Sequence, residues 1–246
     1  MMNLFTYPFK TSDPKTFIVL WSKGLKERGI LTMKVEFDCN DPTLIAELAA
    51  IRHLLFERKV FNCEVLDGVG IKLYVGRGAI KKLSRASSSK SEVFGYAAFV
   101  RTRLAGVTIE VCRKPSEFLP ELTDDVSKED VTVSFDEYYR PHEPYETPAM
   151  GTLYITYHAL EAYIDKISTG DPRRPFKSLV KRLNNPKLEQ VPLPERVLKH
   201  KARKYGPDKT VEAWSMPHGD FTYLCALENG KRTLVTVFEN KSTVKY

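Results

Sequence analysis

The hydrophobic positions of the first half of the chain follow a strand-like pattern and then a helical one. Residues 16–21 and 30–37 are rich in β-branched and aromatic residues, which predicts two strands. Asp41 and Pro42 follow and predict a helix start, because Asp caps helices and Pro fits their first turn. Leucine and isoleucine then recur at helical spacing as far as residue 59, so a helix should follow the strands.

Further strands and helices are predicted as far as residue 111. Residues 71–75 predict a buried strand, and residues 79–84 are helix-prone. A second helix is expected over 92–104, and a last strand over 107–111. This order of elements, in which strands and helices follow one another, predicts a mixed α/β domain over residues 1–119.

The second half of the chain begins with helical spacing. Thr156 is a candidate N-cap for a first helix, and residues 176–183 predict a second. Asn229 and Gly230 are a strong hairpin signal between the last two of several strand-like runs. These runs cover residues 197–204, 210–216, 221–227 and 233–238. The order predicts two helices followed by a four-stranded antiparallel sheet over 151–246, so the whole chain is expected to be a two-domain α+β protein.

Charge is distributed in three blocks. Residues 1–120 carry 19 Lys and Arg against 12 Asp and Glu, and residues 151–246 carry 17 against 10. Between them, residues 121–150 carry 2 against 9. Two basic domains indicate a polyanionic partner, usually a nucleic acid, although a basic protein without such a partner remains open.

The acidic block is the expected domain boundary. Residues 140–148 are punctuated by proline, which continues neither a helix nor a central strand. Residues 131–135 alternate like a short strand, so part of the block can be ordered. We therefore expect an acidic linker over 120–150, in which residues 121–146 offer a surface to a protein partner.

Other sequence features exclude several classes. The four cysteines form no CxxC pair, which argues against a zinc site and a disulfide framework. No cofactor or metal is expected. No apolar run approaches the roughly 18 residues of a membrane span, and residues 1–10 do not read as a signal peptide. The expected location is the cytoplasm, without a membrane partner.

Residues 40–51 contain Ala46-Glu47-Leu48 on the first predicted helix. With the element order, this motif resembles the ribonuclease H-like fold, in which an Ala-Glu-Leu on the first helix supplies one metal-binding Glu, here Glu47. The resemblance implies several carboxylates around two metal ions. The strand over 71–75 instead leads into Gly-Arg-Gly, and residues 16–21 contain no acid. This domain is expected to be inactive, with Glu47 solvated or in a salt bridge.

What remains of the first domain is a basic surface. Gly76 and Gly78 flank Arg77, and this glycine-rich stretch can approach a phosphate backbone through main-chain N–H groups. The alternative is a solvated loop and helix face. The candidate RNA-binding residues here are Arg77, Lys81, Lys82 and Arg85.

The second domain carries two further motifs. Residues 155–159 read Ile-Thr-Tyr-His-Ala, and residues 234–238 read Leu-Val-Thr-Val-Phe. With two helices before a sheet, they resemble the ribonuclease-toxin fold of barnase-like, colicin-type and RelE-type enzymes. The resemblance covers most of residues 152–240 and implies metal-free RNA cleavage.

Such cleavage needs a proton acceptor, a proton donor and cations around the phosphate. His158 is the candidate acid or base, with His200 or His218 as its counterpart and Thr236 beside the phosphate. Each has an alternative: His158 as a half-buried core residue, His218 as an exposed turn residue, and Thr236 as an ordinary strand residue.

Cations and aromatic residues add a binding surface to the second domain. In an extended chain, Lys199, Lys201 and Arg203 share one face and can follow a phosphate backbone. Tyr205, Trp214 and Tyr223 can stack bases, with core packing as the alternative. The candidate RNA-binding residues here are Lys177, Lys181, Arg182, Lys199, Lys201, Arg203, Lys204 and Tyr205.

The sequence therefore favours a non-catalytic protein, of phage or mobile-element origin, that binds structured host RNA such as ribosomal RNA. A toxin-like, metal-independent endoribonuclease that uses the second domain is the first alternative. A protein-interaction adaptor is the second.

Overall fold

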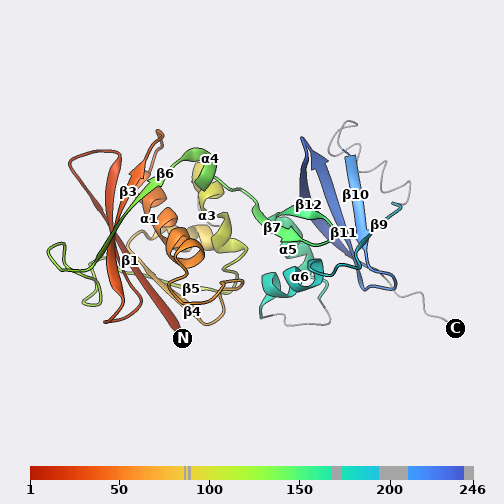
Figure 1. Ribbon diagram of the computed structural model, residues 1–246, viewed down its shortest axis with the longest axis horizontal. Helices are drawn as coiled ribbons and strands as arrows, with labels where there is room; N and C mark the ends of the chain where they lie inside the picture. Colours follow the sequence, from red (N-terminus) through yellow and green to blue (C-terminus); the bar gives the residue numbers. More distant parts are fainter. Residues whose placement is uncertain (86, 88–89, 168–172, 194–209, 241–246) are drawn as a thin grey trace. The chain divides into compact units, whose positions relative to one another are not determined.

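The chain forms two compact units, Met1–Pro141 and His142–Tyr246. The computed structural model describes residues 1–85, 87, 90–167, 173–193 and 210–240 (Figure 1). The structure contains helices and two sheets, as expected for a two-domain α+β protein. Among the described residues, no helix is long and apolar enough to cross a bilayer.

The first unit is built on a six-stranded sheet in the order β5-β4-β1-β2-β3-β6. Its strands are β1 (Met2–Lys10), β2 (Thr16–Ser22), β3 (Arg28–Val35), β4 (Ile71–Val75), β5 (Thr108–Val111) and β6 (Ser127–Val133). Strands β1, β2 and β3 form antiparallel pairs, whereas β4, β5 and β6 are each parallel to their neighbours.

Strand β1 is absent from the sequence-based prediction, although it is central. Pro8 lies within it, and proline cannot donate a ladder hydrogen bond. Strand β4 pairs with β1 only from Met2 to Phe5, so Pro8 lies where β1 has no neighbour on that side. The strand is therefore compatible with its proline.

Helices cover one face of this sheet (Figure 1). Helix α1 (Pro42–Arg52) begins at Asp41, whose side chain caps it by accepting a hydrogen bond from the Leu44 amide, as predicted. A π-turn, η1 (His53–Glu57), continues it, and residues 43–52 are all buried. The other elements are α2 (Ala79–Ser84), η2 (Ser91–Val93), α3 (Phe94–Arg101) and α4 (Phe135–Tyr138).

The two faces of the sheet contribute to separate apolar clusters. Leu4, Val19 and Leu31 are fully buried in the larger cluster with α1 and α3. On the opposite face, a smaller cluster includes Phe5 and Leu119, so the chain between β5 and β6 covers part of that face. This two-sided burial gives the first unit a substantial core.

The acidic block is not a linker, which corrects the prediction for residues 120–150. Strand β6 pairs with β3 over its whole length, with Val131 and Val133 buried and most of its charged residues outward. Glu129 accepts a hydrogen bond from Arg58 and contacts His53, whose other ring nitrogen contacts Glu57. Part of the acidic charge is thus neutralised within the first unit.

The second unit also contains a six-stranded sheet, in the order β7-β8-β12-β11-β10-β9. Its elements are β7 (Glu143–Thr147), β8 (Gly151–Ile155), α5 (Tyr157–Ile164), α6 (Pro175–Leu183), β9 (Glu189–Val191), β10 (Thr210–Ser215), β11 (Phe221–Glu228) and β12 (Lys231–Glu239). Strand β8 is parallel to β12, and the other neighbours are antiparallel.

Local signals in the second unit are confirmed, whereas its sheet is larger than predicted. The Thr156 hydroxyl accepts a hydrogen bond from the Ala159 amide and caps α5. Asn229 and Gly230 both have positive φ and connect β11 to β12. The predicted four-stranded antiparallel sheet lacks β7, β8 and β9, and the predicted strand over 197–204 lies outside the described residues.

Candidate nucleic-acid interface

Glu47 is fully buried in the first unit, which corrects the expectation of a solvated or salt-bridged residue. Its Oε1 accepts hydrogen bonds from the Thr6 hydroxyl at 2.9 Å and the Gly76 amide at 2.7 Å, and its Oε2 accepts one from the Arg77 amide at 2.8 Å. Burial raises the pKa of Glu47 to about 7 in spite of these donors. Both oxygens are used by the protein, so Glu47 holds the β4–α2 connection in place.

The glycine-flanked stretch is engaged within the protein. The main-chain N–H groups of Gly76 and Arg77 donate hydrogen bonds to Glu47. They are therefore not directed at a phosphate, which the sequence had predicted. The Arg77 guanidinium contacts Asp41 at 3.0 Å, and Lys90 donates to the same carboxylate. Burial alone would raise the pKa of Asp41, but the bond from Lys90 and the charge of Arg77 hold it below its ordinary value. Arg77 is therefore a poor phosphate ligand.

Three other predicted residues of the first unit remain available. Lys81 and Lys82 lie on α2, and Arg85 follows it. Lys82 and Arg85 are exposed and Lys81 is half-buried. Within the described part of the chain, none of them forms an ion pair. They make a small basic surface at the end of α2.

Helix α6 carries the basic surface of the second unit. It is strongly amphipathic: Phe176, Leu179 and Leu183 are buried, whereas Lys177 and Lys181 are exposed one helical turn apart. No ion pair to either lysine is found among the described residues. Two uncompensated ammonium groups on one helix face are a suitable contact for a phosphate backbone.

Arg182 differs from these lysines because its side chain is held in place. Its Nε donates to the Tyr163 hydroxyl at 2.9 Å, and that hydroxyl lies 2.8 Å from the Ser178 hydroxyl. The guanidinium also lies 3.7 Å from Asp220 and over the ring of Phe221. Packing thus fixes the position of the Arg182 guanidinium at the cavity.

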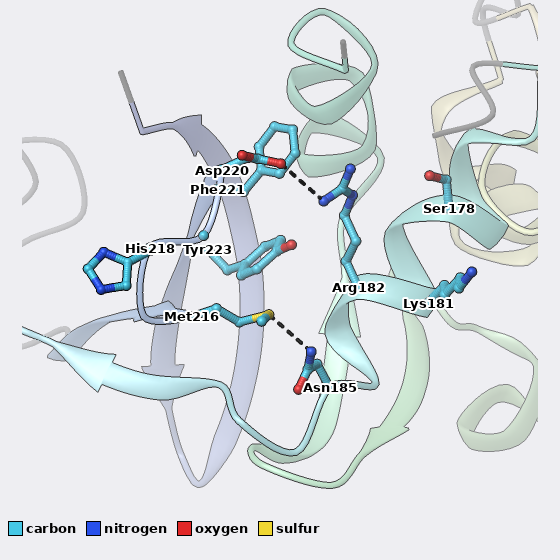
Figure 2. A pocket seen from close by; sticks show the side chains of 10 residues that line it. Ser178, Lys181, Arg182, Asn185, Met216, His218, Asp220, Phe221 and Tyr223 are labelled. Carbon is cyan, nitrogen blue, oxygen red and sulfur yellow. Dashed lines mark hydrogen bonds and ion pairs between the residues drawn. The ribbon is translucent and has the colours of Figure 1, made fainter. Parts of the chain in front are cut away.

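A cavity of about 480 Å³ lies between α6 and the connection from β10 to β11 (Figure 2). Its helix side carries Lys181 and Arg182, which are cationic. The opposite side is formed by apolar and aromatic residues together with a carboxylate. The lining residues are Ser178, Lys181, Arg182, Asn185, Met216, His218, Gly219, Asp220, Phe221 and Tyr223. Cationic, hydrogen-bonding and aromatic residues thus line one hollow.

Tyr223 is the most distinctive residue of this cavity. Only 3% of the residue is exposed, and burial raises the pKa of its phenol above the ordinary value. Its hydroxyl points toward α6 (Figure 2). Within the part of the chain that the structure describes, no hydrogen bond to this hydroxyl is found. The phenol ring is thus buried, whereas its hydroxyl lines the cavity and is open to water or to a ligand there.

The turn between β10 and β11 is fixed by side chains that lie outside the cavity. The Ser215 hydroxyl donates to the Phe221 carbonyl at 3.0 Å, and the Asn240 amide donates to the Gly219 carbonyl at 2.8 Å. His218 has a φ of 58°, and its ring points away from α6 (Figure 2). The wall formed by this turn is therefore held rigidly.

Two of the three predicted catalytic residues line another pocket. His158 on α5 and Thr236 on β12 both contribute to a hollow of about 630 Å³. His158 is exposed, so it is not a core residue. Glu161 and Asp165 line the same hollow with one cation, Lys166, and two carboxylates oppose the approach of a phosphate. His218 belongs to the other cavity and not to this one.

The remaining predicted residues divide into two groups. His200 and the cluster Lys199, Lys201, Arg203, Lys204 and Tyr205 lie outside the described residues. Trp214 is half-buried, donates to Glu212 at 3.1 Å and lies beneath the Arg232 guanidinium, so the protein already uses it. It is not an open stacking surface.

The sequence points to Tyr223, Lys181 and Arg182 separately, and only the fold brings them to one cavity. No sequence signal identifies Ser178 or Asp220, because no spacing rule connects a helix to a turn about 40 residues later. Comparisons with protein-family models, with curated proteins and with solved structures find no match for this chain. The site is therefore argued from its geometry.

Proposed function

We propose that this protein binds RNA without cleaving it. The observation that carries the proposal is the exposed pair Lys177 and Lys181 on α6, beside a cavity that also presents Arg182. Lysine and arginine side chains that neutralise phosphates release condensed counterions, and this release drives binding. The net charge of +7 adds a long-range attraction for the same partner.

The first unit supports a non-catalytic role. Its order of three strands, a helix, a strand, two helices and a strand agrees with the resemblance to a ribonuclease H-like domain. The Glu47 oxygens are occupied by Thr6, Gly76 and Arg77, so this carboxylate is not free to coordinate a metal ion. The surface at Lys82 and Arg85 is the contact proposed for this unit.

Structured host RNA, including ribosomal RNA, is the proposed ligand, and the cytoplasm of a cell that carries a phage or mobile element is the proposed setting. Basic surfaces read RNA through its phosphate geometry and shape. This choice follows from the two resemblances and is an analogy from fold.

Charge reversal on α6 tests the proposal. Replacing both lysines, Lys177→Glu with Lys181→Glu, should weaken binding of a labelled ribosomal RNA fragment roughly 10- to 100-fold at moderate salt. It should also reduce the slope of log affinity against log salt by about 2, because two phosphate contacts are lost. Fluorescence anisotropy over a salt series measures both quantities.

A control with the same change of net charge separates this site from general attraction. Lys10→Glu with Lys26→Glu alters two exposed lysines of the first unit, far in sequence from α6. An equal loss of affinity in this control would show that net charge alone causes binding. If the wild-type protein binds no RNA, the proposal is wrong.

A metal-independent endoribonuclease is the second candidate, because His158 and Thr236 line one pocket. If it is correct, His158→Ala should slow cleavage of co-purified RNA by about 100-fold or more, the usual contribution of a general acid or base. Incubation of that RNA with each protein in excess chelator, followed by mapping of the ends, is the measurement. We expect the RNA to stay intact with both proteins, since two carboxylates surround His158.

A further inference from the structure

We infer that the cavity beside α6 receives one unpaired nucleotide of the bound RNA. The inference rests on the proposed function and goes further, because it defines which feature of the RNA is recognised. The RNA would then be bound at a bulge, loop or end and not along a continuous duplex.

The size of the cavity is the first reason. About 480 Å³ lies within the range of sites that enclose a small molecule, and one nucleotide is a ligand of that kind. A base inside a duplex is stacked and paired, so it can enter such a hollow only after leaving the helix. Sequence-specific proteins for RNA usually bind unpaired bases for this reason.

The chemistry of the walls is the second reason. Tyr223 and Met216 provide apolar surface for the face of a base, while the Phe221 ring already packs beneath the Arg182 guanidinium. The Tyr223 hydroxyl and the Asp220 carboxylate, of which 61% is exposed, can bond to the donors and acceptors at its edge. Lys181 lies on the helix side of the cavity, one helical turn from Lys177. The phosphate of the same nucleotide would lie on this side.

The rigidity of the walls is the third reason. Tyr163 is fully buried and connects the Ser178 hydroxyl to Arg182, so two groups of the helix wall are oriented before any ligand arrives. Ser215 and Asn240 hold the opposite wall. A preformed site loses little conformational entropy on binding, which favours a specific ligand.

The unused Tyr223 hydroxyl connects these arguments. This hydroxyl is not among the fully buried side-chain atoms that lack a partner, so it is open to water or to a ligand in the cavity. In this cavity it faces the helix that carries the cations (Figure 2). The edge of a nucleobase inside the cavity can form a hydrogen bond with it.

The test compares two hairpins of the same length, one fully paired and one with a single bulged nucleotide in its stem. Fluorescence anisotropy should show that the wild type binds the bulged hairpin about 10-fold more tightly. Tyr223→Phe, which removes only the hydroxyl, should lower this ratio about fivefold, the usual effect of one lost hydrogen bond to a ligand. Lys177 does not line the cavity. Lys177→Glu should therefore weaken the binding of both hairpins equally and leave the ratio of affinities unchanged.

The outcomes are distinguishable. Equal affinity of the wild type for both hairpins would overturn the inference but leave RNA binding intact. An unchanged ratio in Tyr223→Phe, with a thermal unfolding midpoint like that of the wild type, would also overturn it. Failure to bind either hairpin or ribosomal RNA would overturn the proposed function itself.

Discussion

Replacing Glu47 with glutamine is expected to destabilise the first unit by roughly 1–3 kcal/mol at pH 7. The wild-type carboxylate accepts hydrogen bonds from the Thr6 hydroxyl and from the amides of Gly76 and Arg77. In either orientation of a glutamine amide, its NH₂ group would face a main-chain N–H. One buried donor would then lose its acceptor, and the connection from β4 to α2 would loosen.

The same substitution should change the dependence of stability on pH. Burial raises the pKa of Glu47 to about 7, compared with 4.5 in an unfolded chain. Between these values the folded protein binds a proton that the unfolded chain releases, so stability falls as pH rises from about 4.5 to 7. The contribution is on the order of 3 kcal/mol across this window. Glutamine does not titrate, so the variant should lose this part of the slope.

Urea unfolding at several pH values between 4.5 and 8 measures both effects. The chain has two tryptophans, Trp21 in the buried core of the first unit and Trp214 in the second. A Trp214→Phe background lets Trp21 fluorescence report the first unit alone, since the two units can unfold separately. His53 also titrates in this range, but it is present in both proteins and cancels in the difference. Equal slopes for the two proteins would contradict the assignment to Glu47.

Gly68→Ala should destabilise the first unit by about 3 kcal/mol, near the upper end of the usual cost of overpacking. A Cβ atom at Gly68 would lie 2.2 Å from the Leu104 carbonyl oxygen and 2.5 Å from the Val107 amide nitrogen. Both atoms belong to the main chain. Moving them would strain the bond from the Gly68 amide to the Ala105 carbonyl and the turn that connects α3 to β5.

Gly78→Ala is the matched control. A Cβ atom at Gly78 would meet only the side chain of Val111, at 3.6 Å, which is an ordinary contact. The same Trp21 fluorescence experiment should therefore give a stability close to that of the wild type. If both variants unfold at the same urea concentration, the close approach of main-chain atoms at Gly68 does not lower the free energy of unfolding by the predicted amount.

The candidate site depends on contacts that the chain makes only after folding. Lys181 and Arg182 were identified from the sequence as cations of a helix. Folding separates their roles, because Tyr163 and Phe221 hold Arg182 at the cavity while Lys181 stays exposed. Similarly, Arg77 was expected to bind RNA, and Asp41 engages it instead.

The sequence by itself determined the features that depend on near neighbours. The caps at Asp41 and Thr156 and the turn at Asn229 and Gly230 are all found, because each needs only a few adjacent residues. The helical face of α6 is also local, since the burial of Phe176 and Leu179 follows the helical repeat.

Only the tertiary structure decided which segments pair and what surrounds each side chain. Strand β1 contains a proline, and three consecutive charged residues lie in the first half of β6, so their local patterns are weak. Their place in the sheet depends on partners such as β2 and β3. Glu47 is buried because Thr6 and Gly76, 41 and 29 residues away in sequence, close around it. Strand pairing and desolvation are set by residues distant along the chain, and a local pattern contains no information about those distances.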